Sequence, residues 1–214
     1  MRLLMKKEGL AKYISHLDLM RTMRRAFVRA EIPLRHSEGF NPHPVMAFAL
    51  PLSVFHDSNC ELLDFEPMAG LDTDALKRLC TSLPEGLDVL EIYSSPRKFG
   101  QIRWLRSLCT LHYSAGVPDD AVSVLTRRFS AGPLIIHKRT KRGEADMDIL
   151  PMIHRISFTA TENTIAVTAV IAAQNPTLNP AGIVDAISQL DGFAPDSAEY
   201  RRLEVLDEEF KVFR

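Results

Sequence analysis

The chain has 214 residues, enough for one large domain or for two domains that each bury a core. Hydrophobic residues make up 46% and charged residues 25%, values that exclude an intrinsically disordered chain. No apolar run approaches the roughly 20 residues of a membrane-spanning helix, and the N-terminus lacks a signal-peptide pattern. We therefore expect a cytoplasmic protein with no membrane partner.

Lysine and arginine are concentrated in two segments, although the formal net charge is −1. Residues 1–45 hold nine Lys and Arg against four Asp and Glu, and residues 97–142 hold ten against two. Two such segments on an acidic background could give the folded protein a positive face that attracts phosphate, if they meet in space. The alternative is ordinary solvated surface charge with no polyanion partner.

Hydrophobic periodicity predicts the same mixture of elements in both halves. In the first half we expect a strand at 2–8, a helix at 16–30, strands at 45–52 and 61–66, a helix from 72 to just before Pro84, and a strand at 87–93. In the second half we expect a strand at 105–113, a helix at 119–129, a strand at 134–137, a hairpin of 155–161 and 164–171, a helix at 180–190 and a strand at 203–206.

These elements predict an α+β fold made of two ferredoxin-like (βαββαβ) halves with antiparallel sheets. The expected domains are residues 1–96 and 97–214. A single α+β sandwich is the alternative architecture.

The first helix is amphipathic and begins at a capping sequence. Its apolar stripe, predicted to be buried, consists of Leu17, Met20, Met23, Phe27 and Val28. Its exposed face consists of Asp18, Arg21, Arg25 and Arg29, which recur at spacings of three and four. Ser15 at the N-cap and Asp18 at the third helical position form a variant of the capping box, a structural role that accounts for both residues.

His16 stands at the first helical position, where free backbone N–H groups favour a neutral imidazole ring. Such a ring could accept a hydrogen bond or take a proton. The same N–H groups, with Arg21 and Arg25 nearby, would also suit a phosphate group.

A polar loop follows the helix at residues 37–45. Gly39 supplies a backbone conformation that a side chain would oppose, and Asn41-Pro42 makes a rigid turn that fixes the directions of Phe40 and His43. Phe40 could stack on a nucleobase or, as loop aromatics often do, fill the core. The histidines do not have the spacing of a metal site, so we predict no metal and no other cofactor.

The second basic constellation is Lys138, Arg139, Lys141 and Arg142, followed by Gly143. These four cations could form a flexible phosphate clamp or a plain solvated hairpin tip. The three cysteines, Cys60, Cys80 and Cys109, form neither a disulfide framework nor a CxxC pair, and we expect buried free thiols. Because GxSxG, Walker, GxGxxG and HExxH motifs are missing, the sequence names no reaction.

Several stretches together resemble the radical-SAM-linked protein family, an uncharacterised domain encoded beside, or fused to the C-terminus of, a radical SAM protein. They are residues 15–21, 24–30, 33–34, 37–44, 83–87, 138–143, 148–151 and 179–180, so the resemblance covers the whole chain. Leu150 stands where that family is expected to have Arg, which weakens a site at Asp148. The resemblance implies a radical SAM partner. The chain itself lacks the CxxxCxxC that would hold the cluster.

A His at the start of the first helix, a basic helix and two ferredoxin-like halves are also similar to RAMP-type CRISPR RNA-processing proteins. We therefore predict a non-catalytic accessory protein that presents structured or ribosomal RNA to its partner. The predicted RNA-binding residues are His16, Arg21, Arg25, Phe40, Asn41, His43, Lys138, Arg139, Lys141 and Arg142. One alternative is a metal-independent RNA endonuclease with His16 as general base, and another is a protein-only adaptor.

Overall fold

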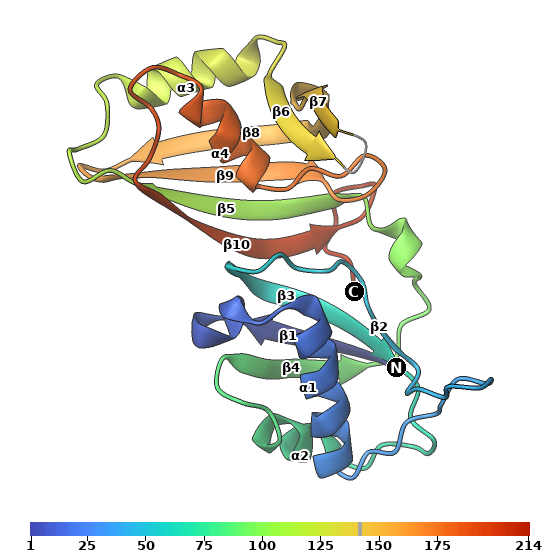
Figure 1. The fold of residues 1–214 in the computed structure, drawn as a ribbon. Helices are drawn as coiled ribbons and strands as arrows, with labels where there is room; N and C mark the ends of the chain where they lie inside the picture. Colours follow the sequence, from blue (N-terminus) through green and yellow to red (C-terminus); the bar gives the residue numbers. More distant parts are fainter. Residues whose placement is uncertain (141–142) are drawn as a thin grey trace. The chain divides into compact units, whose positions relative to one another are not determined.

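The computed structural model describes residues 1–140 and 143–214 and divides the chain into two compact units. The first unit comprises Met1–Phe99 with Arg214, and the second comprises Gly100–Phe213. Each unit combines two α-helices with an antiparallel sheet within the described residues (Figure 1). The fold class is therefore α+β.

In the first unit the strand order is β4-β1-β3, with β2 paired to the other side of β3, and every pairing is antiparallel. The elements in chain order are β1 (Arg2–Lys7), a 3-10 helix (Gly9–Tyr13), α1 (His16–Arg29), β2 (Met46–Phe48), β3 (His56–Phe65), α2 (Ala75–Thr81) and β4 (Leu87–Tyr93).

The core of the first unit lies between the two helices and one face of this sheet. Leu3 of β1 pairs with Leu63 of β3, and both side chains are fully buried beneath α1. From α1 itself the core receives Leu19, Met23, Ala26 and Phe27.

The predicted apolar stripe of α1 is wrong at both of its ends. Leu17 and Val28 are 66% and 77% exposed, whereas Met23 and Phe27 are buried as expected. At about 100° per residue, Leu17 and Val28 lie on the flank of the helix that turns away from the sheet. The exposed polar face was predicted correctly, because Asp18, Arg21, Arg25 and Arg29 are all exposed.

In the second unit the main sheet has the order β10-β5-β9-β8, again antiparallel throughout. The elements in chain order are a 3-10 helix (Phe99–Gln101, which begins at the end of the first unit), β5 (Trp104–His112), α3 (Ala121–Ser130), β6 (Ile135–Thr140), β7 (Gly143–Asp148), a 3-10 helix (Leu150–Met152), β8 (Ile153–Ala160), β9 (Thr164–Ala172), α4 (Ala181–Ser188) and β10 (Ser197–Leu206).

Both helices of the second unit cover the same face of this sheet (Figure 1). Cys109 of β5 and Phe158 of β8 each pair with Val167, so their side chains share one face. The Phe129 ring of α3 packs on Phe158 at 5.3 Å, and the Cys109 thiol contacts the carbonyl of Pro180 at the start of α4. The predicted hairpin of β8 and β9 is confirmed.

The strand predicted at 134–137 forms, but it lies outside the main sheet. β6 pairs with β7 in a separate two-stranded sheet, and β7 was not predicted. The predicted basic loop from 138 is partly strand, because β6 continues to Thr140 and β7 begins at Gly143. The paired residues His137 and Asp146, whose side chains lie 2.5 Å apart, are both polar, and the run of charged residues around them hides the strand alternation in the sequence.

Three other strand boundaries differ from the predictions. The strand predicted at 61–66 begins at His56, the one predicted at 203–206 begins at Ser197, and the one predicted at 45–52 is limited to β2. Pro44 and Pro51 flank β2 and cannot donate to a ladder. β3 and β10 are longer than predicted because their first residues are mostly polar. The backbone of these residues pairs with neighbouring strands, although their side chains give no apolar alternation.

Arg2 is the most demanding buried group of the first unit, with a side chain only 1% exposed. Its Nε and Nη2 donate to the two carboxylate oxygens of Asp64 at 2.7 and 2.9 Å. It also donates to the Ser95 hydroxyl and the Arg97 carbonyl, and its guanidinium lies 4.5 Å from the centre of the Phe99 ring. One side chain thus joins β1, β3 and the segment after β4.

No α-helix among residues 1–140 and 143–214 has the length and apolar character needed to cross a membrane.

Replacing Arg2 with Met should lower the free energy of unfolding by about 3 kcal/mol, because Asp64 loses its bidentate partner and the hydrogen bonds to Ser95 and Arg97 are lost. Urea unfolding measures this loss. The control is Arg21→Met, which removes an ion pair between exposed groups and should cost no more than about 0.5 kcal/mol. Equal losses in the two variants would contradict the role given to Arg2.

Candidate nucleic-acid interface

The start of α1 is held by the predicted capping interaction. The Ser15 hydroxyl oxygen accepts from the Asp18 backbone N–H at 3.2 Å, and the hydroxyl donates to the Asp18 carboxylate at 2.7 Å. The bond from Ser15, together with the neighbouring Arg21 guanidinium, lowers the pKa of Asp18 below its usual value. Ser15 and Asp18 therefore fix the helix terminus on which His16 stands.

His16 is the first residue of α1 and is half-buried. Its ring packs edge-on against Phe48 of β2, with 5.7 Å between ring centres. Its Nδ1 is buried and has no hydrogen-bond partner among the described residues. A nuclease would need a second acid–base group beside this ring, and the neighbour found here is an apolar ring.

The two arginines predicted to bind phosphate on α1 are not equally available. Arg21 donates to Asp18 at 2.9 Å, in an ion pair whose side chains are 65% and 53% exposed. Arg25 is exposed and makes no hydrogen bond or ion pair within the described residues. Of the two predicted arginines, Arg25 is thus the one that a phosphate could engage without displacing a carboxylate of the described residues.

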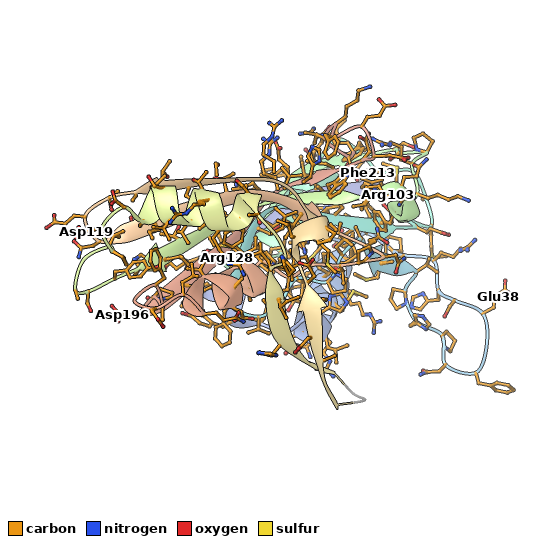
Figure 2. The ribbon with its side chains drawn as sticks, turned by 90° about the horizontal axis from the view of Figure 1, so that it is seen from above. Glu38, Arg103, Asp119, Arg128, Asp196 and Phe213 are labelled. Carbon is orange, nitrogen blue, oxygen red and sulfur yellow. The ribbon has the colours of Figure 1, made fainter. Side chains whose placement is uncertain are left out.

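The polar loop is closed by hydrogen bonds across its base. The Ser37 backbone N–H donates to the His43 carbonyl at 2.8 Å, and the His43 N–H donates to the Ser37 hydroxyl at 3.2 Å. The Ser37 hydroxyl also lies 2.9 Å from His43 Nδ1. Gly39 has φ +121°, as the sequence predicted, a conformation that a side chain would strain. Figure 2 shows Glu38 on this loop, extended away from the helices and strands of the unit.

Phe40 does not fill the core, one of its two predicted roles. Its side chain is at 112% of the reference exposure, the highest among the exposed large apolar residues. Asn41 and His43 on the same loop are also exposed. The loop therefore presents an aromatic face together with an amide and an imidazole.

A pocket of about 530 Å³ lies between α1, the segment after it and the base of the loop. It is lined by Arg24, Phe27, Val28, Glu31, Ile32, Pro33, Leu34, His36, Pro44 and Met68. His36 and Pro44 pair as an isolated bridge immediately outside Ser37 and His43, so the pocket borders the loop. The sequence did not predict this pocket, because its apolar pattern places Val28 in the buried stripe of α1, whereas Val28 is exposed.

Lys138 and Arg139, the first two cations of the second basic constellation, belong to the second unit. Lys138 and Arg139 lie on β6, where their backbones pair with Ala145 and Glu144 of β7. Lys141 and Arg142 lie outside the described residues.

The second unit also has an aromatic cluster that sequence analysis missed. The rings of Trp104, His154 and Phe210 come from β5, β8 and the turn after β10. His154 and Phe210 stack at 4.0 Å, and Trp104 and Phe210 stack at 5.3 Å. These residues are distant in sequence, and only the strand order brings them together.

No group of three or more metal-ligating side chains occurs within residues 1–140 and 143–214. All three cysteines are free thiols, but the predicted burial holds only for Cys109: Cys60 is half-buried and Cys80 is exposed. Burial raises the pKa of Cys109 to about 12, so this thiol stays protonated.

Residues 1–180 match the model of a protein family described as "Uncharacterized protein conserved in bacteria (DUF2344)". The chain belongs to this family. A comparison with curated proteins gives no match. Among solved structures, the chain is similar to one in the crystal structure of a Cbf5-Nop10-Gar1 complex, with a TM-score of 0.54 and 13% identity. The similarity covers 98% of this chain and 49% of that one, so this DUF2344 protein spans about half of its length and shares its fold.

Replacing His16 with Ala should leave the protein folded, since the ring loses only an edge-to-face contact worth about 0.5–1.5 kcal/mol. The measurement is urea unfolding followed by circular dichroism. In the control Leu19→Ala, a fully buried side chain of the same helix is truncated, and we expect a loss of about 2–5 kcal/mol. A loss as large for His16→Ala would assign His16 to the core.

Proposed function

We propose that this protein is a non-catalytic accessory protein that binds RNA and presents it to a radical SAM partner enzyme. The observation that carries the RNA-binding part is Phe40, a fully exposed aromatic side chain on a loop closed by hydrogen bonds. Burial of a Phe side chain contributes about 1.5–3 kcal/mol, a gain that this residue forgoes in the free protein. A surface ligand would recover that free energy.

The neighbours of Phe40 support a nucleobase as that ligand. Unpaired bases of RNA stack on aromatic rings and form hydrogen bonds through their edges. Asn41 offers an amide that both donates and accepts, and His43 offers an imidazole on the same loop. Arg25 on α1, which has no ion-pair partner among residues 1–140 and 143–214, adds a cation for the RNA backbone.

The radical SAM partner rests on the family resemblance of the sequence. The chain has only the isolated cysteines Cys60, Cys80 and Cys109, so a cluster that generates radicals would belong to the partner. The free thiols also support our proposal of a cytoplasmic location, where thiols stay reduced.

We further propose that both units are ferredoxin-like. In the first unit the element order is βαββαβ and the sheet order is β4-β1-β3-β2. The second unit has the corresponding order, β10-β5-β9-β8, once β6 and β7 are treated as a hairpin inserted between α3 and β8. These two orders are what supports the proposal.

A protein-only adaptor is the second candidate, favoured by exposed apolar side chains on the first unit. Leu10 is 80% exposed, and the exposed rings of Tyr13 and Phe55 pack edge-on at 5.7 Å. Surface aromatic residues of this kind also serve as anchors in protein interfaces. Incubation with total cellular RNA separates the candidates. Retained intact RNA supports the presenter, and shortened RNA supports the His16 nuclease. If no RNA is retained, co-purification of the radical SAM protein supports the adaptor.

Replacing Phe40 with Ala should weaken binding of single-stranded RNA by about 1–3 kcal/mol, the usual contribution of one base–aromatic stack. Fluorescence anisotropy with labelled oligoribonucleotides measures the affinity. The matched control is Phe55→Ala, which removes another exposed aromatic side chain of the same unit and should leave RNA affinity unchanged. If Phe40→Ala binds like the wild type, the loop is not the RNA contact.

Replacing Lys138, Arg139, Lys141 and Arg142 together with Gln should weaken RNA binding equally for all sequences. Each phosphate contact to single-stranded RNA contributes about 0.7 to the slope of log affinity against log salt, so four lost contacts should flatten the slope by up to about 3. Salt titrations from low to moderate concentration measure this slope. Arg35→Gln, whose guanidinium is already paired with Glu66, is the control and should not change it. An unchanged slope in the quadruple variant would remove the ribbon from the interface.

A further inference from the structure

The pocket beside the loop has the size and the lining of a ligand site. Its volume of about 530 Å³ lies within the range of small-molecule pockets, roughly 300–1,000 Å³. Its mouth is bordered by Val28 and Met68, which are 77% and 71% exposed. Large apolar side chains at an open mouth favour a ligand with a flat apolar surface.

Proline rings add two more rigid apolar surfaces. Pro33 follows α1 and Pro44 closes the loop, and both line the pocket. The Pro33 carbonyl accepts from the Met68 N–H at 2.9 Å, which fixes these two lining residues relative to each other. The walls are therefore held in place before any ligand arrives.

Three polar side chains enter this apolar lining: Arg24, Glu31 and His36. The Nε of Arg24 is buried and lacks a hydrogen-bond partner among the described residues. The His36 Nδ1 lies 3.1 Å from the Leu34 carbonyl, so in the neutral ring Nδ1 carries the proton and Nε2 can accept. Glu31 contributes a carboxylate, which is an acceptor only. The pocket thus combines a cation, two acceptors and flat apolar walls.

We propose that this pocket binds one unstacked purine nucleotide of the RNA, with guanine the base that fits best. The base face would lie against the apolar walls, the adjacent N1–H and N2–H groups of guanine would donate to the Glu31 carboxylate, and the phosphate would pair with Arg24. An apolar protein side chain fills the walls less well, because it would leave the buried Arg24 Nε without a hydrogen-bond partner. This inference rests on the proposed function, and it extends the RNA contact from Phe40 to the pocket at the base of the loop.

The test is a titration of the full chain with GMP, followed by NMR chemical shifts or calorimetry. Val28→Trp should occupy the mouth and weaken GMP binding at least tenfold, without unfolding the protein, because Val28 is exposed. Leu17→Trp is the matched control: it places the same ring on the same helix at a site 66% exposed and outside the pocket, and should leave GMP binding within twofold of wild type.

The contribution of Arg24 is tested with Arg24→Gln and a second ligand. This variant should bind GMP about as weakly as the wild type binds guanosine, a loss of about tenfold, while its guanosine affinity stays unchanged. Equal losses for GMP and guanosine would overturn the phosphate assignment.

Failure of this proposal can be distinguished from failure of the proposed function. If GMP does not bind, or binds Val28→Trp as tightly as wild type, while RNA binding still depends on Phe40, the pocket proposal is wrong and RNA binding stands. If neither GMP nor RNA binds and the radical SAM protein occupies the pocket instead, so that Val28→Trp releases it, both proposals are wrong and the adaptor is correct. GMP binding that Val28→Trp weakens supports the pocket when the same substitution also weakens RNA binding, and GMP binding by a chain that retains no RNA overturns the assignment of the pocket to RNA.

Discussion

A buried positive charge at the second residue sets the geometry of the first unit. The Arg2 side chain is 1% exposed, and its burial is compensated by two hydrogen bonds to Asp64 and by bonds to the Ser95 hydroxyl and the Arg97 carbonyl. This constraint fixes the end of β3, and the stem of the polar loop is built on the next residues. Glu66, two positions beyond Asp64, donates from its N–H to the Val45 carbonyl, and its own carbonyl accepts from Arg35. Backbone hydrogen bonds of Glu66 thus connect the base of the polar loop to the strand that Arg2 holds in place.

The energetic consequence is that ordering of the loop occurs during folding and not during binding. The Ser37–His43 bonds and the conformation of Gly39 restrict the backbone in the free protein, so a ligand need not supply the entropy of closing it. Folding leaves the apolar side chain of Phe40 exposed to solvent. A rigid support with one exposed aromatic side chain is the arrangement that base stacking and protein anchoring both use, and the polar neighbours of Phe40 favour the base.

Local signals in the sequence predicted local structure well. The Ser15 cap, the four helices and the β8–β9 hairpin followed from spacing and turn chemistry, because each depends on residues close in the chain. Strand partners and the pocket did not follow, because they depend on contacts between distant segments. Val28 illustrates the limit: its apolar character suggested the core, yet its position on the helix flank places it beside Met68, forty residues later, at the mouth of a pocket. An apolar residue of a helix can therefore lie in the core or line a pocket, and only the tertiary structure distinguishes these positions.

The β6–β7 ribbon is a two-stranded sheet that does not pair with the main sheet of the second unit. Its ladder is made between its own two strands, and Ile136 and Ile149 anchor its base in buried positions. Because the pairing of β10, β5, β9 and β8 does not involve β6 or β7, changes at the polar positions of these two strands carry little penalty for that sheet. Members of this family could therefore diverge in ribbon length and charge while conserving one scaffold.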